Sequence, residues 1–187
     1  MDEEVMQVDQ EELSLYQAFG NYATESLFWQ LIYLESAIFN TPLRQDAKNK
    51  LMNMSKMYET IMTSIYPMGE CRELVTAITN SNRLFIVYVE QLTQGNGRCT
   101  ATKQQWRENG RQIAQMLCKI NPYWQATEWT AMISHECDLL DTIATNMQTR
   151  NYAIFGNIAP VCRRLAIDMS SYMSSGIVRQ RQDSWTY

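Results

Sequence analysis

Apolar residues recur at intervals of three and four along most of the chain, which is the spacing of an amphipathic α-helix. The pattern is clearest between Leu43 and Ile65, where it continues for more than twenty residues. A helix is predicted wherever the pattern returns in phase. The predicted helices cover residues 22–40, 43–65, 71–92, 102–120, 127–147 and 151–176.

Helix-breaking residues separate these segments. Thr41, Thr102 and Thr127 stand just before apolar runs, so we expect each hydroxyl to cap a helix N-terminus. Pro122 prevents the fourth helix from continuing, and Pro160 is expected to kink the sixth because proline lacks the backbone N–H that a helix interior needs. The breaks lie at Thr41-Pro42, Pro67-Met68-Gly69, Gly95-Asn96-Gly97 and Asn121-Pro122.

One segment is ambiguous between strand and helix. Residues 84–89 are apolar, β-branched and aromatic, which alone would suit a buried strand. We predict a helix because the apolar positions on either side stay in phase and no second strand is predicted to pair with it. The sequence therefore predicts an all-α protein, a single antiparallel bundle of about six helices in which neighbours in sequence are neighbours in space.

The turn after the fourth predicted helix combines a helix stop with two large aromatic side chains. Pro122 halts the helix, and Tyr123 and Trp124 follow directly. We expect Tyr123 and Trp124 to pack with Trp106 and Trp129 at one end of the bundle, because buried aromatic residues contribute large areas to packing. The alternative is an aromatic ligand-binding loop, but a structural corner is the simpler interpretation.

Length and composition fit one domain. A chain of 187 residues can bury a core of its own, and 7 glycines and 4 prolines are too few for a fold of many short turns. Six of the 20 acidic residues and none of the 16 basic residues lie within residues 1–12. We therefore expect an acidic N-terminal segment (1–20), a helical bundle (21–180) and a C-terminal tail (181–187). The acidic segment is either a solvated tail or an arm that docks on a basic surface.

The cysteines and the hydropathy pattern indicate the compartment. The five cysteines are odd in number and show no Cys-x-x-Cys spacing, so they predict a reducing, cytoplasmic environment rather than disulfides or a zinc site. No export signal is visible at the N-terminus, and the longest apolar run is far shorter than the roughly 20 residues of a membrane helix, so we expect no membrane insertion. The 12 methionines are expected to fill gaps in the core, with a promiscuous binding groove as the alternative.

Candidate chemistry is sparse. His135 is the only histidine, and of its acidic and thiol neighbours only Asp138 shares its helix face. The chain lacks the Glu-x-x-His motif of di-iron bundles, the Gly-x-Ser-x-Gly nucleophile motif and a phosphate-binding loop. We therefore predict no catalytic residue, no metal and no cofactor. His135 is the one weak metal candidate, and we interpret it as a polar core residue hydrogen-bonded to a neighbouring helix.

Three basic residues recur every four positions on the fourth predicted helix. Lys103, Arg107 and Arg111 thus form a basic stripe along one helix face. Such a stripe is usually solvated, and the net charge of -4 does not favour a nucleic-acid binder. If the basic stripe has a function, we expect it to contact an acidic partner, such as the acidic segment of another copy.

A longer motif resembles a known group of proteins. It reads Trp106-x-x-Asn109-x-x-x-Ile113-Ala114-x-x-Leu117-x-x-Ile120-Asn121-Pro122-Tyr123-Trp124, and continues with Trp129, Met132, His135, Tyr152 and Gly176-Ile177. This resembles a family of uncharacterised helical-bundle proteins from bacteria and some large DNA viruses, with a looser match over residues 25–97. The family pattern carries histidines where this chain has Leu31 and Ser81. The resemblance therefore implies a bundle scaffold and does not favour catalysis.

Two functions from different classes stay open. The first is a non-enzymatic structural or interaction subunit of a homo-oligomer or larger assembly, with the basic stripe and Trp185 and Tyr187 of the tail as possible contacts. A virion of a large DNA virus is one such assembly, with the chain as a minor capsid protein. The second is a small-molecule or metal-binding bundle, a degenerate enzyme, with a polar site around His135, Trp129 and Tyr123. A third, nucleic-acid binding by the basic stripe, has less support.

Overall fold

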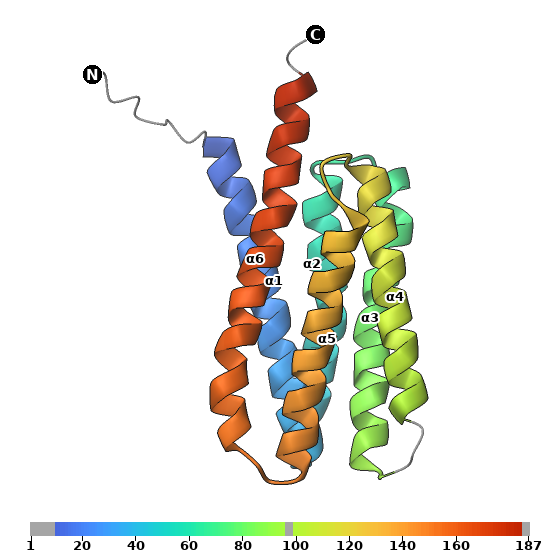
Figure 1. Ribbon diagram of the computed structural model, residues 1–187, viewed down its shortest axis with the longest axis vertical. Helices are drawn as coiled ribbons and strands as arrows, with labels where there is room; N and C mark the ends of the chain where they lie inside the picture. The colour runs from blue at the N-terminus through green and yellow to red at the C-terminus, as the bar shows by residue number, and fades with distance from the viewer. Residues whose placement is uncertain (1–9, 96–98, 185–187) are drawn as a thin grey trace, which may run out of the picture.

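The computed structural model describes residues 10–95 and 99–184, and all regular structure in this part of the chain is helical (Figure 1). The helices are α1 (Gln10–Ile38), α2 (Arg44–Thr63), α3 (Met68–Thr93), α4 (Cys99–Ile120), α5 (Ala126–Gln148) and α6 (Ala153–Ser184). The predicted all-α class and the predicted number of helices are confirmed. Residues 84–89, which could have formed a strand, lie inside α3.

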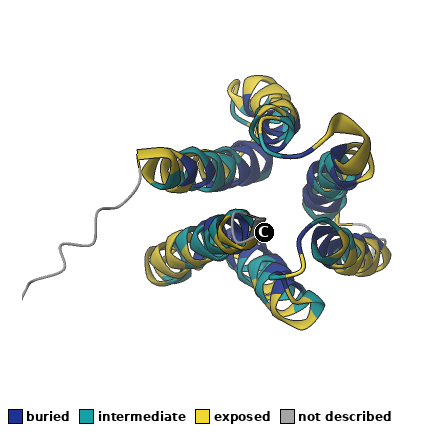
Figure 2. Cartoon of the chain, turned by 90° about the horizontal axis from the view of Figure 1, so that it is seen from above, coloured by how far each residue is buried: buried dark blue, intermediate teal, exposed yellow. Residues whose placement is uncertain are grey.

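The helices alternate in direction and form a ring. Each helix contacts the one that follows it in sequence, and α6 returns to contact α1, so the ring is closed. Seen from above, the buried residues face the inside of the ring and the exposed residues face the outside (Figure 2). This is the antiparallel bundle that the periodicity predicted, with its core where the six apolar faces meet.

The first helix begins earlier than predicted. Leu15 and Phe19 are one helical turn apart and buried, and they anchor the additional turns of α1. Glu11 and Glu12 occupy its first turn, where carboxylates interact favourably with the helix dipole. The predicted boundary of an acidic segment at residue 20 is therefore wrong, because the acidic residues obscured this apolar spacing. The rest of that segment, residues 1–9, lies outside the described residues.

The last helix is also longer than predicted, since Gly176 lies inside α6 rather than near its end, and the helix continues past the predicted tail boundary at residue 181. The last turns of α6 extend beyond the other helices, and the first turns of α1 lie below and beside them (Figure 1). The hydroxyls of Tyr16 and Ser175 share a hydrogen bond of 3.2 Å, and Arg181 lies 3.5 Å from the carboxylate of Glu11. These contacts keep the projecting helix ends paired.

The predicted threonine caps are not formed. The N-cap position is Leu43 in α2 and Gln125 in α5, and neither side chain makes a cap hydrogen bond. Thr41 lies two residues before the N-cap of α2. Thr127 lies two residues after the N-cap of α5, inside that helix. Thr102 lies inside α4, where its hydroxyl donates to a glutamine side chain of α3 at 2.7 Å. For Thr102, a hydrogen bond to a neighbouring helix thus takes the place of the cap that the sequence suggested.

Three residues at helix ends adopt left-handed backbone conformations. Gly95 (φ +66°) follows α3, as expected for a helix stop, while Asn40 (φ 52°) follows α1 and Arg150 (φ 63°) follows α5. Pro160 lies inside α6 as predicted. The kink that it should introduce stays a prediction.

Candidate functional site

The corner after α4 is organised by a buried asparagine. The Nδ2 of Asn121 donates to the hydroxyl of Tyr66 (2.9 Å) and to Oε1 of Gln180 (2.8 Å), and its Oδ1 accepts the backbone N–H of Tyr123 (2.8 Å). Pro122 is exposed and Tyr123 is half-buried. The corner therefore ties the end of α4 to the α2–α3 connection and to α6. Sequence reasoning treated Asn121 only as a turn residue.

Trp124 inserts its indole between the corner and α6. It is 2% exposed, its Nε1 donates to the backbone carbonyl of Met173 (3.2 Å), and it lies over Gly176, where a side chain would collide with the ring. Its ring meets those of Trp129 (centroids 6.3 Å apart) and Tyr66 (6.2 Å) edge to face. Trp124 and Trp129 therefore pack together, as the sequence suggested.

Trp106 lies elsewhere in the core. Its ring packs against Phe85 (5.3 Å between centroids) and Tyr88 (6.2 Å), both on α3, and its Nε1 donates to the hydroxyl of Ser81 (3.0 Å). The expectation that Trp106 joins the cluster around Trp124 is wrong. The reason is its position in the first half of α4, far along the helix from the corner.

His135 lies on the outer face of α5 and is exposed. The prediction that it is a core residue is therefore wrong, and His135 is not among the residues that line the central cavity described below. Within the described residues, no group of three or more histidine, cysteine, aspartate or glutamate side chains could hold a metal ion. Of the two positions where the resembling family carries histidine, Ser81 faces the interior and Leu31 packs against the core. These three positions do not form one site.

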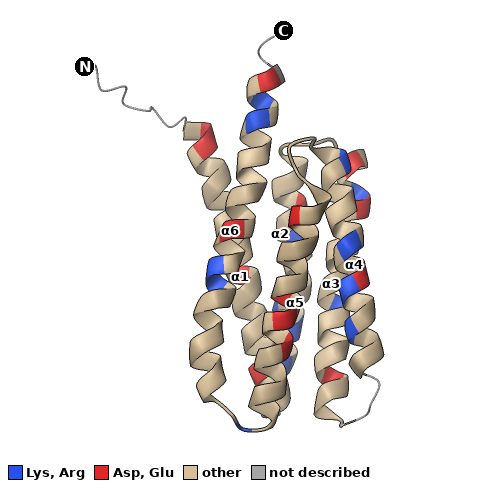
Figure 3. Cartoon of the chain, in the orientation of Figure 1, with Lys and Arg blue, Asp and Glu red and all other residues tan. Residues whose placement is uncertain are grey.

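The basic stripe on α4 is paired with acids of the same chain (Figure 3). Nζ of Lys103 lies 2.5 Å from a carboxylate oxygen of Asp141 on α5, and Arg107 forms an ion pair with Asp138, which is also on α5. Arg111 pairs with a glutamate one turn earlier on α4. Two of the three basic residues thus attach α4 to α5, which does not support the predicted role as a free interaction surface. The other predicted contacts, Trp185 and Tyr187, lie outside the described residues.

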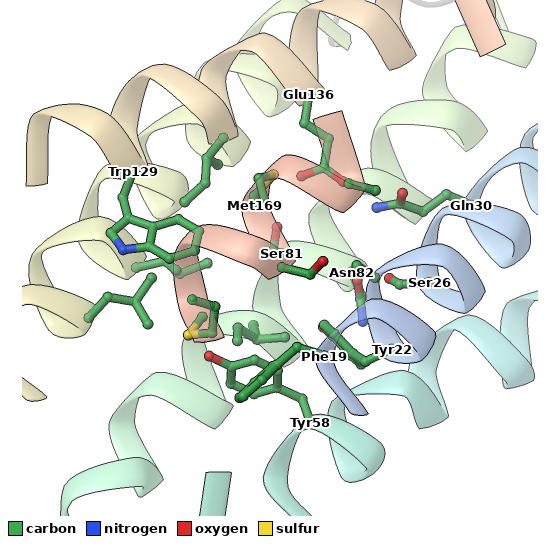
Figure 4. Close-up of a pocket in the computed structure, with 18 residues that line it drawn as sticks. Phe19, Tyr22, Ser26, Gln30, Tyr58, Ser81, Asn82, Trp129, Glu136 and Met169 are labelled. Carbon is green, nitrogen blue, oxygen red and sulfur yellow. The ribbon is translucent and has the colours of Figure 1, made fainter. Parts of the chain in front are cut away.

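A cavity of about 140 Å³ lies at the centre of the ring, and all six helices contribute to its wall (Figure 4). Four aromatic residues line it: Phe19, Tyr22, Tyr58 and Trp129. The polar residues of the wall are Ser26, Gln30, Ser81, Asn82, Glu136 and Ser170. Aliphatic residues and methionines complete it. In Figure 4, Glu136 and Gln30 lie next to each other, and Phe19, Tyr22 and Tyr58 gather below them.

Three polar atoms of this wall lack hydrogen bonds. Gln30 Oε1, the Tyr58 hydroxyl and Trp129 Nε1 are buried, and none has a partner among the described residues. Their side chains are 7%, 3% and 2% exposed. An unpartnered buried polar group costs about 1–3 kcal/mol, so such groups are normally few and scattered. The three atoms belong to residues of one cavity wall and comprise an amide oxygen that accepts, an indole N–H that donates and a hydroxyl that can do either.

Glu136 is the one carboxylic acid among the described residues of the wall. Burial raises the pKa of its carboxyl, and a side-chain hydrogen bond from Gln30 offsets part of that shift. Burial also raises the pKa of Tyr22 and of Tyr58, and the charge of Glu136 raises that of Tyr22 further. Both tyrosines therefore remain protonated and can donate hydrogen bonds at neutral pH.

The described residues of the wall offer few groups for acid–base catalysis. Among the described lining residues there is no histidine, cysteine, lysine or arginine, and one carboxyl alone does not supply the paired acid and base of a hydrolase. Cys137, next to Glu136 in sequence, is buried, and burial raises the pKa of its thiol. It is therefore a poor nucleophile.

Sequence reasoning identified Trp129 but missed the other polar and aromatic residues of the cavity. A signal was present, because Gln30 lies three residues after Leu27 and Glu136 lies three residues after Ile133, on the faces that the apolar pattern assigns to the core. A polar residue in phase with buried ones indicates either a satisfied core contact or a site. Only the structure shows that the two polar residues face the same cavity.

Fold and cavity together define a six-helix bundle, closed into a ring, with a cavity at its centre that is lined by aromatic, aliphatic and a few polar side chains. Comparisons of the chain with known protein families, with curated proteins and with solved structures gave no match. The family resemblance carried by the Trp106 to Trp124 motif therefore stays a prediction. None of the helices in the described residues combines the length and the hydrophobicity needed to cross a membrane.

Proposed function

We propose that this protein is a non-enzymatic small-molecule-binding bundle that holds its ligand in the central cavity. The observation that carries the proposal is that three residues with an unpartnered buried polar atom line one cavity together with the half-buried carboxylic acid Glu136. A ligand that reaches one of these groups supplies the hydrogen bond that it lacks and so offsets its desolvation. This proposal replaces the site that the sequence suggested around His135 with one that includes its neighbour Glu136, on the inner side of the same helix, α5.

The dimensions of the cavity limit the ligand. A cavity of about 150 Å³ in an engineered protein accepts benzene, so about 140 Å³ accommodates a molecule of roughly six to eight non-hydrogen atoms. Aromatic walls from α1, α2 and α5 supply apolar contact, and the polar groups fix its orientation. This division between apolar walls and a few convergent polar groups is typical of small-molecule sites.

The proposal is tested by screening small cyclic and branched compounds of that size by ligand-observed NMR. Ala166→Leu narrows the cavity from α6, while Ala131→Leu makes the same change at an exposed position of α5. We expect hits that bind the native protein and Ala131→Leu but not Ala166→Leu. A screen without hits, or hits that bind Ala166→Leu equally well, would contradict the proposal.

A second candidate function is the interaction subunit predicted from sequence, and one observation favours it. Phe39, Tyr152 and Phe155 are exposed together at the end of the bundle opposite the projecting helix ends, with the rings of Phe39 and Tyr152 5.9 Å apart. Exposed aromatic clusters are typical of contacts between protein chains. Other copies or the subunits of a larger assembly are the proposed partners, a virion of a large DNA virus being one such assembly.

This second function is tested by sedimentation of the native protein and of Tyr152→Ser and Phe155→Ser variants. We expect a concentration-dependent increase in mass that these changes weaken and that Met68→Ser, at another exposed apolar position, leaves intact. A strictly monomeric native protein that also binds no chain from its source would exclude this role.

A further inference from the structure

We infer that the central cavity selects a small organic ammonium ion, whose charged group pairs with the carboxylate of Glu136 while its apolar part lies among the aromatic side chains. This inference rests on the proposed ligand-binding function and goes beyond it by assigning the chemical class of the ligand. It concerns an amine of about six to eight non-hydrogen atoms, in agreement with the size of the cavity.

The charge of the wall favours a cation. Glu136 is the one acid among its described residues, and none of these residues carries a positive charge. Two basic residues of the neighbouring helix α4, Lys103 and Arg107, are paired with Asp141 and Asp138 of α5. A half-buried carboxylate without a cation is destabilised by desolvation, and one hydrogen bond from Gln30 compensates for only part of this. A ligand that brings its own positive charge supplies the missing partner.

The aromatic side chains favour the same charge. Tyr22 and Tyr58 lie with ring centroids 5.0 Å apart, Phe19 meets Tyr58 edge to face at 6.4 Å, and Trp129 lines the wall from α5. The faces of aromatic rings attract cations, tryptophan most strongly, and the attraction grows where water is excluded. A neutral ligand gains apolar contact with these rings but leaves Glu136 unpaired, and an anion is repelled by it.

The hydrogen-bonding groups fit an ammonium rather than a metal ion. An ammonium carries two or three N–H donors, and the wall offers the carboxylate of Glu136 and the unpartnered Oε1 of Gln30 as neighbouring acceptors. A metal ion is usually held by several histidine, cysteine, aspartate or glutamate side chains, and the described residues contain no group of three or more of these that could hold one. The side chains of the wall therefore favour an organic ammonium ion over a metal ion.

The decisive experiment compares cyclopentylamine with cyclopentanol. The two have the same shape and the same number of non-hydrogen atoms, but only the amine is charged at pH 7. Their dissociation constants are measured by titration in ¹H–¹⁵N correlation spectra of the native protein and of Glu136→Gln. Gln keeps the size of Glu and can still accept a hydrogen bond from Gln30, and circular dichroism verifies that the variant is folded.

We expect the native protein to bind cyclopentylamine at least about tenfold more tightly than cyclopentanol, and Glu136→Gln to abolish that preference by weakening amine binding alone. Equal or tighter binding of the alcohol, or amine binding that Glu136→Gln leaves unchanged, would overturn the inference while leaving the proposed ligand-binding function intact. Failure of both compounds and of the whole screen to bind would instead overturn both.

Discussion

The contact between Trp124 and Gly176 can be tested with a single methyl group. In Gly176→Ala, the new Cβ would lie 2.1 Å from Nε1 and 2.4 Å from Cδ1 of the Trp124 indole, well inside van der Waals contact. The indole is buried and cannot rotate into solvent. It must shift, and its hydrogen bond to the Met173 carbonyl (3.2 Å) must lengthen or break.

Three terms determine the size of the effect. Alanine in place of glycine in a helix interior favours folding by about 1 kcal/mol. Overpacking of a buried side chain disfavours folding by about 1–3 kcal/mol, and a buried indole N–H without a partner adds about 1–3 kcal/mol. The unfavourable terms are larger, so Gly176→Ala should lower the free energy of unfolding by about 3 kcal/mol.

Urea unfolding, followed by circular dichroism, measures this change. The matched control is Gly20→Ala, in the middle of α1, where a new Cβ meets no atom within 4 Å. The control should gain up to about 1 kcal/mol. Combining Gly176→Ala with Trp124→Phe should restore part of the loss, because a smaller ring leaves space for the methyl group. If Gly176→Ala is as stable as Gly20→Ala, the described contact is not part of the folded protein in solution.

Three further predictions concern the cavity and the α4–α5 contact. Tyr58→Phe removes a hydroxyl without a hydrogen-bond partner and should not lower the free energy of unfolding. Tyr66→Phe removes a hydroxyl that makes two hydrogen bonds and should lower the free energy of unfolding in urea by about 1–3 kcal/mol; equal losses for the two variants would contradict this. Burial raises the pKa of Glu136 above its ordinary 4.5, so the folded protein binds the extra proton and its stability falls as the pH rises above that value. Glu136→Gln should therefore be more stable than the native protein at pH 7. At pH 3.5, where the carboxyl is neutral in the folded and the unfolded state, it should be no more stable; a difference in unfolding free energy that does not change with pH would contradict the raised pKa of Glu136. Lys103→Met should cost about 0.2–1 kcal/mol by removing the ion pair with Asp141, and the cost should shrink in 1 M NaCl; a salt-independent cost would point to packing instead.

The architecture was predictable because each helix repeats one simple signal. Apolar residues such as Leu51, Met54 and Tyr58 recur at three- and four-residue steps, and short connections force consecutive helices to be antiparallel neighbours. The helix ends were less predictable. Caps depend on single side chains, and a hydroxyl such as that of Thr102 bonds to another helix when one is within reach.

The cavity was not predictable, because it depends on which residues of different helices meet. Gln30 and Glu136 are more than a hundred positions apart and each, taken alone, is one polar residue among apolar ones. Likewise, nothing near Gly176 in the sequence indicates that Trp124 requires a residue without a side chain there. Local periodicity fixes which face of a helix is buried, but not the height at which two helices oppose each other.

The closure of the ring by α1 and α6 also determines when the cavity first exists. As the chain is synthesised, each helix from α2 to α5 can pack on its predecessor as soon as it emerges from the ribosome, but the side of α1 that packs against α6 waits for a helix encoded more than a hundred residues later. Until α6 arrives, Phe19 and the other cavity residues of α1 lack one wall and remain accessible to chaperones. The proposed ligand can therefore bind only after that last docking step, and if it is present during translation it would act on the end of folding and not on its beginning.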